Sequence, residues 1–110
     1  MEIAILLKSG PRTDEARRAL QTAGDMLLRD HNVHLCLLQE AVRFCSPGTK
    51  CSSSMDLQEL IEKNLQVHIL ICDTELRGIP GPCGTRGVSE ESYESLIDLM
   101  VSCDRVIGIL

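Results

Sequence analysis

Four short runs of the sequence are apolar almost throughout, and they constrain the fold more than any other feature. They are residues 3–7 (IAILL), 33–38 (VHLCLL), 67–72 (VHILIC) and 106–110 (VIGIL). Continuous runs of β-branched and aliphatic residues are typical of strands covered on both faces, whereas half-exposed strands alternate apolar and polar residues. The runs therefore predict four buried strands.

Apolar stripes with helical spacing lie between these runs. We expect Thr13 to cap the first helix and Ser89 the third, because their hydroxyls can accept free backbone N–H groups. Asp56 and Glu59 are expected to supply a capping box for the second helix. The stripes consist of Ala16, Ala19, Leu20, Ala23 and Leu27, then Leu57, Leu60 and Ile61, and finally Tyr93, Leu96, Ile97 and Met100.

The alternation of strands and helices predicts an α/β fold. Right-handed crossovers between successive strands produce a parallel sheet with helices on both faces, which is a three-layer α/β/α architecture. A chain of 110 residues with 44% hydrophobic residues fits one domain, so we expect residues 1–110 to form a single unit. Residues 43–54 and 79–88 contain prolines and glycines and are expected to be surface loops.

Composition disfavours nucleic acid and membranes as partners. The net charge of −5 opposes a phosphate-binding surface, and the near absence of aromatic residues removes platforms for base stacking. The N-terminal segment has only five consecutive apolar residues, too few for a signal peptide or a membrane span. We therefore expect a cytoplasmic protein that binds neither directly.

The cysteines indicate thiol chemistry rather than a disulfide framework or a metal site. There are six, at positions 36, 45, 51, 72, 83 and 103, and the long apolar runs describe a core that needs no disulfides. We expect most of them to be reduced. Their spacing matches no zinc pattern, and the loop KSGPRTDEARRA lacks a nucleotide-binding motif, so no metal and no cofactor is expected.

Cys72 is the sharpest candidate for a functional residue. It ends the third apolar run, and ligands of open parallel sheets bind beyond the carboxyl ends of the strands. The loops at residues 8–11 and 39–42 should converge on the same edge. Backbone N–H groups of a helical turn that starts at Asp73, aided by Arg77, would stabilise a sulfur anion. The alternative is a buried thiol that simply ends a strand.

The histidines are weaker candidates. His34 and His68 occupy the same second position in their runs and should be near neighbours in adjacent strands. Both lie at the amino ends of those strands, opposite the edge that holds Cys72, so we interpret them as structural or surface residues. His31 has no partner that the sequence identifies, and a Cys/His catalytic pair is poorly supported.

Several motifs together resemble the DsrE-like proteins of sulfur relay and sulfur oxidation, which include the TusD-type subunit of the tRNA thiolation relay. In order along the chain they are SGP, EARRAL, QEAV, ICDTELRGI and SCDRVIGIL. Two departures are Ala41, where the family often has glycine, and PGPCGTRG, which replaces a longer insert that carries a strand in relatives. The resemblance therefore implies a DsrE-like parallel sheet of four to five strands.

The resemblance also implies a function. Cys72 matches the family's active cysteine, which carries sulfane sulfur as a persulfide and passes it to a thiol of a partner protein. We therefore predict a sulfur carrier or sulfurtransferase that forms a trimer or hexamer and meets sulfur donor and acceptor proteins. Residues expected to line its pocket or stabilise the anion are Ser9, Gly10, Glu40, Asp73, Thr74 and Arg77.

Two other functions stay open. The first is a non-catalytic α/β interaction module in which Cys72 is only packed, so that the chain is not an enzyme. The second is a thiol redox sensor, because Cys83 follows Cys72 by eleven residues in a loop and can fold back as a resolving thiol. An incidental loop thiol is the plainer interpretation of Cys83.

Overall fold

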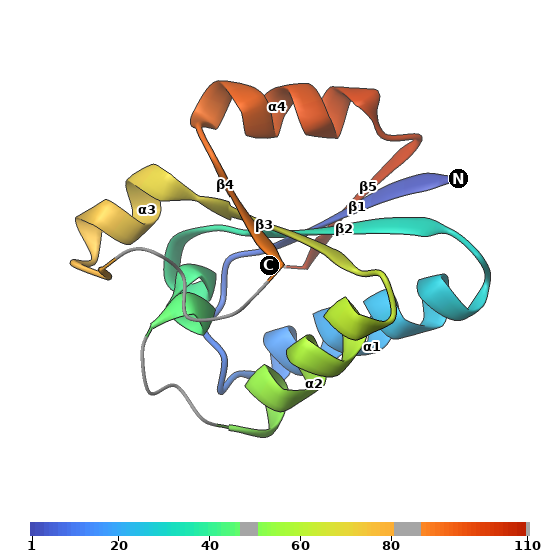
Figure 1. Cartoon of the computed structure of the whole chain (residues 1–110), viewed down its shortest axis with the longest axis horizontal. Helices are drawn as coiled ribbons and strands as arrows, with labels where there is room; N and C mark the ends of the chain where they lie inside the picture. The colour runs from blue at the N-terminus through green and yellow to red at the C-terminus, as the bar shows by residue number, and fades with distance from the viewer. Residues whose placement is uncertain (47–50, 81–86, 110) are drawn as a thin grey trace.

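A parallel sheet organises the molecule. The computed structural model describes residues 1–46, 51–80 and 87–109. Within them, the sheet has five strands in the order β4-β3-β2-β1-β5, and all neighbours are parallel (Figure 1). The strands are β1 (Glu2–Leu7), β2 (Asn32–Leu37), β3 (Gln66–Leu70), β4 (Val88–Glu91) and β5 (Arg105–Ile109). The predicted α/β class with a parallel sheet is thus confirmed.

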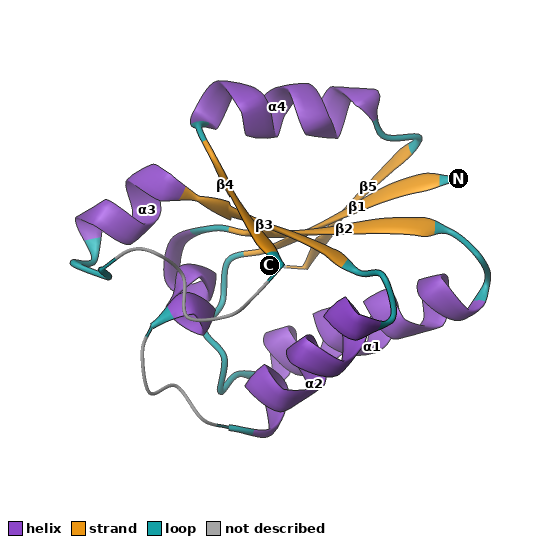
Figure 2. Cartoon of the chain, viewed as in Figure 1, coloured by secondary structure: helices purple, strands orange, loops and turns teal. Residues whose placement is uncertain are grey.

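The helices cover the two faces unequally. α1 (Asp14–Leu28) and α2 (Ser52–Glu62) lie side by side on one face, and α4 (Tyr93–Ser102) lies on the other (Figure 2). α3 (Ile71–Leu76) follows β3 directly, and a 3-10 helix, η1 (Gln39–Cys45), follows β2. None of the helices in the described part of the chain combines the length and apolarity that a membrane span requires.

The main core lies between the sheet and the α1/α2 layer. Alternate residues of the strands point to this face, and α1 meets them with alanines, whose small side chains let the helix approach closely. A second, smaller cluster lies beneath α4 and consists of Cys36, Leu70 and Leu96. The fully buried strand residues of the main core include Ile3, Ile5, Leu7, Val33, Leu35, Leu37, Val67 and Ile69.

The helix starts differ from the sequence prediction at two of three places. Thr13 caps α1 as expected, accepting the N–H of Ala16 at 3.2 Å. Ser89 does not cap a helix, because residues 88–91 pair with β3 as a fifth strand, and Ser92 caps α4 instead. The predicted capping box at residues 56 and 59 is also wrong. α2 begins earlier, at Ser52, and Cys51 and Ser54 form its capping box.

The loops predicted at residues 43–54 and 79–88 are shorter than expected, because helices and a strand extend into these segments. Residues 43–45 complete η1, residues 52–54 begin α2, and Val88 begins β4. Sheet pairing and capping supply hydrogen-bond partners for backbone groups that a loop would leave to water. Strand pairing joins residues distant in sequence, so local composition underestimates regular structure at these positions.

Candidate functional site

Cys72 lies at the carboxyl end of β3 but within a helix. β3 ends at Leu70 and the six-residue α3 begins at Ile71, so Cys72 occupies the first helical turn (Figure 1). Its thiol is free and its side chain is exposed. No hydrogen bond to its sulfur occurs within the described residues. The expected cap-like cradle of N–H groups is not formed, because a first-turn residue projects its side chain from the helix surface.

Hydrogen bonds join the segments that follow β2 and β3. The backbone N–H of Gln39 donates to Asp73 Oδ2 at 2.7 Å. Arg77 Nε donates to Glu40 Oε1 at 3.1 Å, and Arg77 Nη1 donates to the Asp73 carbonyl at 3.3 Å. These bonds hold α3 against η1. The two loops therefore converge next to Cys72, as parallel strand ends should.

The charges at this junction satisfy one another. Glu40 also pairs with Arg43, and the hydrogen bond from Arg43, followed by that from Arg77, holds the Glu40 pKa below its usual value. Arg77 lies 3.8 Å from Asp73 Oδ1 in addition to its bond with Glu40. Its positive charge is thus directed at two carboxylates. Arg77 positions α3 rather than pairing with the Cys72 sulfur.

The loop after β1 approaches the same edge. A Cβ added at Gly10 would lie 3.8 Å from the Glu40 carbonyl oxygen, so the two backbones are close. Ser9 is half-buried in this loop. The Thr74 hydroxyl donates to the Ile71 carbonyl at 2.6 Å and is therefore engaged within α3. Gly10, Glu40 and residues of α3 are brought together, whereas Cys83 lies outside the described residues.

Cys51 is a thiol that the sequence analysis did not single out. It precedes α2, is partly exposed, and its backbone N–H donates to the Ser54 hydroxyl at 3.0 Å. Burial acts to raise the pKa of Cys51, but hydrogen bonds from Ser54 and Ser53 outweigh it, so the net pKa is lowered. The serines that follow Cys51 were the sequence signal for a helix start at this position. Cysteine is an uncommon N-cap, which hid the helix start.

The remaining cysteines differ in environment. Cys36 is buried beneath α4, and desolvation is the largest cause that raises its pKa to about 12. Cys103 ends α4 as its C-cap, and its pKa is also raised, first by burial. Both are free, whereas Cys45 is disulfide-bonded. With Cys51 and Cys72, four cysteines of the described residues are free, in line with the prediction that most are reduced.

The two strand histidines are in direct contact and are structural rather than exposed. His34 Nδ1 lies 3.0 Å from His68 Nε2, and His34 is buried. The register pairs His34 with Gln66 and Cys36 with His68, so the rings meet diagonally across the strands. Within the described residues, no group of three His, Cys, Asp or Glu side chains has an arrangement that could hold a metal ion.

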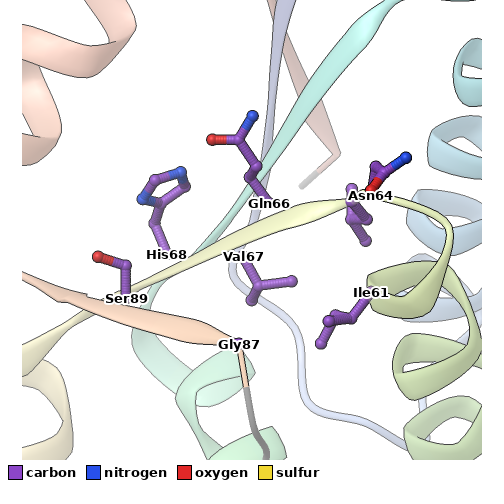
Figure 3. Close-up of a pocket in the computed structure, with 8 residues that line it drawn as sticks. Ile61, Asn64, Gln66, Val67, His68, Gly87 and Ser89 are labelled. Atoms are coloured by element: carbon purple, nitrogen blue, oxygen red, sulfur yellow. The ribbon is translucent and has the colours of Figure 1, made fainter.

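A shallow pocket lies away from Cys72, at the amino end of β3. It has a volume of about 460 Å³ and lies between Ile61 of α2, Val67 and His68 of β3, and Ser89 of β4. Figure 3 shows that Gln66 and His68 project from one side of β3 and Val67 from the other. The pocket thus occupies the opposite end of the strands from the carboxyl edge and contributes nothing to the site around Cys72.

Comparisons with known proteins place the chain by its fold. No model of a known protein family matches the sequence, and no curated protein matches it. Among solved structures, the YchN protein from E. coli superposes with a TM-score of 0.87 at 23% identity, covering 98% of both chains. BT1422, a conserved protein of unknown function from Bacteroides thetaiotaomicron, superposes with a TM-score of 0.71 at 12% identity, covering 98% of this chain and 94% of its own. This protein therefore shares the α/β fold of YchN over nearly the whole length of both chains.

Proposed function

We propose that the protein is a cytoplasmic sulfur carrier of the DsrE-like type, which holds sulfane sulfur on Cys72. The observation that carries the proposal is the position of Cys72. It is the most exposed free cysteine within the described residues, and it lies at the carboxyl edge of a parallel sheet, where such folds bind their ligands. The sequence motifs around it support the same function, and the fold shared with YchN agrees with the parallel α/β sheet that the DsrE-like resemblance implies.

The chemistry needs only a thiolate and access for two partners. The Cys72 thiolate attacks the outer sulfur of a donor persulfide, the donor S–S bond breaks, and the donor leaves as a thiolate. An acceptor thiolate then attacks the outer sulfur on Cys72 and regenerates the Cys72 thiolate. No electrons are gained or lost overall. Because the outer sulfur extends about 2 Å beyond Sγ, an exposed cysteine presents it to both partners.

The residues around Cys72 then position the thiol rather than react. Asp73, Arg77 and Glu40 fix α3 against η1, and so fix the direction in which Cys72 projects. We propose that the donor and the acceptor are proteins that dock over this edge. Donor and acceptor proteins with acidic docking surfaces are disfavoured, because this protein is itself acidic, with a net charge of −5.

Self-association is part of the proposal. Apolar side chains on the α4 side are exposed, among them Ile97 at 39%, Val101 at 80% and Val106 at 45%. A second copy of the chain could cover them, since homo-oligomers commonly bury such surfaces. We expect a trimer or hexamer. Sedimentation that gives only a 12.1 kDa monomer at micromolar concentration would contradict this.

The decisive experiment measures sulfur uptake. The protein is incubated with a low-molecular-weight persulfide, and intact mass spectrometry followed by peptide mapping locates any added sulfur. We expect one sulfur atom on Cys72, and none on the Cys72→Ser variant. Cys51→Ser is the matched control, since Cys51 is a partly exposed free thiol that also lies at a helix start.

The remaining outcomes select the alternatives. Equal uptake by Cys72→Ser and the wild type overturns the carrier mechanism. No uptake on any cysteine favours the interaction module. Loss of two hydrogens from a pair that includes Cys72 under mild oxidation favours the redox sensor. Transfer of the sulfur from Cys72 to an added acceptor thiol distinguishes a carrier from a dead-end adduct.

A further inference from the structure

Four ionisable side chains form a continuous chain across the sheet beneath α4. They come from four neighbouring strands: Glu2 of β1, His34 of β2, His68 of β3 and Glu91 of β4. Glu2 Oε1 lies 3.5 Å from His34 Nε2, and His34 Nδ1 lies 3.0 Å from His68 Nε2. His68 Nδ1 lies 3.2 Å from Glu91 Oε1. The chain continues into α4, because the Ser95 hydroxyl donates to Glu91 Oε2 at 2.7 Å.

The two hydrogen bonds of His68 and the ion-pair contact between His34 and Glu2 each require one proton. Glu91 is ionised, because hydrogen bonds from Ser95 and Ser89 lower its pKa against the opposing effect of burial, so the proton facing it belongs to His68 Nδ1. The contact between the two rings requires one proton between two nitrogens. At the other end, Glu2 Oε1 faces His34 Nε2, while Glu2 Oε2 is buried without a hydrogen-bond partner in the described residues. A third proton completes this end.

We propose that His34 and His68 together hold three ring protons, and hence one positive charge, between two carboxylates, and that this charge acts as a proton-dependent clamp of β4 and α4 onto the sheet. With three protons, every contact in the chain pairs a donor with an acceptor. β4 is an edge strand of the described sheet and pairs with β3, and Glu91 lies at its end, shortly before α4 begins. The clamp therefore acts where an edge strand leads into α4.

In this proposal the positive charge belongs to His34, whose Nε2 faces Glu2 Oε1 at 3.5 Å. Burial is the largest cause that lowers the pKa of His68, and it outweighs the hydrogen bond with Glu91, so His68 stays neutral. The other titratable groups that act on this region are Cys36, Cys103 and Asp104. The two thiols are neutral because their pKa values are raised, and Asp104 accepts the backbone N–H of Glu2 at 2.8 Å.

The clamp loosens on both sides of its working pH. Loss of the third proton leaves two acceptors facing each other at one contact of the chain. A fourth proton leaves two N–H donors facing each other between the rings, across the 3.0 Å contact. Either mismatch costs a buried hydrogen bond and leaves a polar group unpaired. β4 and α4 are then freer to separate from the sheet, which uncovers Cys36 on β2.

Nitrogen NMR on the wild-type protein tests the proton count directly. Long-range 15N–1H correlations report which ring nitrogens carry protons. Near neutral pH we expect His68 as the Nδ1–H tautomer and His34 with both nitrogens protonated. Two neutral rings throughout the pH range in which the protein is folded would overturn the proposal. This measurement needs no variant, so it stands even where substitutions unfold the chain.

Hydrogen exchange tests the clamping. After correction for intrinsic exchange rates, we expect the protection of α4 and β4 amides to fall as the pH rises above neutrality, by up to about tenfold per pH unit for one released proton. The α1 amides on the other face should not follow. His34→Gln should flatten the dependence in α4, and His31→Gln, outside the chain of contacts, should leave it unchanged. An equal dependence in α1, or an unchanged one in His34→Gln, contradicts the clamp.

Discussion

The two faces of the sheet solve the same burial problem in different ways. On the α1/α2 face the inward strand residues are aliphatic, and all of β1 and β2 on this face is buried. On the α4 face the strands carry Glu2, His34, Cys36 and His68 toward a single helix. The first face is held by apolar burial, which does not depend on the direction of individual contacts. The second depends on polar groups that each need a partner.

This difference suggests a division of roles. We expect the α1/α2 face to supply most of the stability, because it buries most of the apolar surface of the strands. The α4 face carries the titratable groups and leaves apolar side chains such as Val101 and Val106 exposed. Cys72 lies at the carboxyl edge of the sheet, on α3, which follows β3 directly. The predictions below test whether the two faces differ as described.

The largest expected effect is a cavity on the α1/α2 face of the sheet. Leu35 is fully buried between the sheet and the α1/α2 layer. Leu35→Ala should lower the free energy of unfolding by about 2 to 5 kcal/mol, from lost apolar transfer and an unfilled cavity. Val106→Ala, at 45% exposure on the α4 side, should cost less than about 1 kcal/mol. Urea unfolding measures both, and equal losses would remove the contrast between the faces.

The next effect is removal of one end of the polar chain. Glu91→Ala leaves the His68 N–H and two serine hydroxyls without their acceptor, so we expect a loss of about 1 to 3 kcal/mol. Glu90→Ala is the matched control, because Glu90 is exposed on the same strand and should change stability by less than about 0.5 kcal/mol. Denaturant unfolding of both variants checks this. A similar loss in Glu90→Ala would mean that strand propensity, not the polar chain, is responsible.

Acid should weaken the α4 face through Glu91 and His68. The folded pKa of Glu91 lies below its ordinary 4.5, so its contribution is present above pH 4.5 and is lost as the pH falls through the folded value. The pKa of His68 is also lowered. Below pH 6.5 the unfolded chain therefore binds a proton at His68 more readily than the folded protein does, and this favours unfolding. Urea midpoints should therefore fall as the pH drops below 6.5. In a His68→Gln variant the decline between 6.5 and 4.5 should become shallower, and an unchanged decline would count against this assignment.

Helix caps should give smaller effects that differ in place. Thr13→Ala and Ser92→Ala each remove a side chain that accepts a first-turn N–H, worth about 1 kcal/mol. Because α1 is part of the main core, Thr13→Ala should lower global stability. Ser92→Ala should appear chiefly as faster hydrogen exchange within α4. Exchange that accelerates uniformly over both faces in Ser92→Ala would show that the α4 layer does not open separately.

The smallest structural effect is expected at Cys72. Its side chain is exposed and makes no hydrogen bond in the described part of the chain, so Cys72→Ser should change the free energy of unfolding by less than about 0.5 kcal/mol. Sulfur uptake should nevertheless be lost. Circular dichroism with urea, together with the mass measurement, separates the two. A large loss of stability would show that Cys72 is a packing residue, as in the interaction-module alternative.

Much of the fold was readable from the sequence. Four apolar runs predicted four of the five strands, and helical stripes predicted α1, α2 and α4, because burial imposes its periodicity directly on the residues. The parallel arrangement followed from their alternation. The convergence of Glu40 with Asp73 and Arg77 at one edge also followed, since strand ends of a parallel sheet share that edge.

The rest depended on pairing between distant residues. β4 reads VSEE, which is polar and short, and it is a strand only because β3 offers it backbone partners. The contact between His34 and His68 is diagonal, two residues out of the alignment that their runs suggest. The exact end of β3 placed Cys72 in a helix instead of at a cap. Local sequence determines which residues avoid water, whereas register and hydrogen-bond partners are set by the assembled sheet, where the energy of each contact depends on both strands.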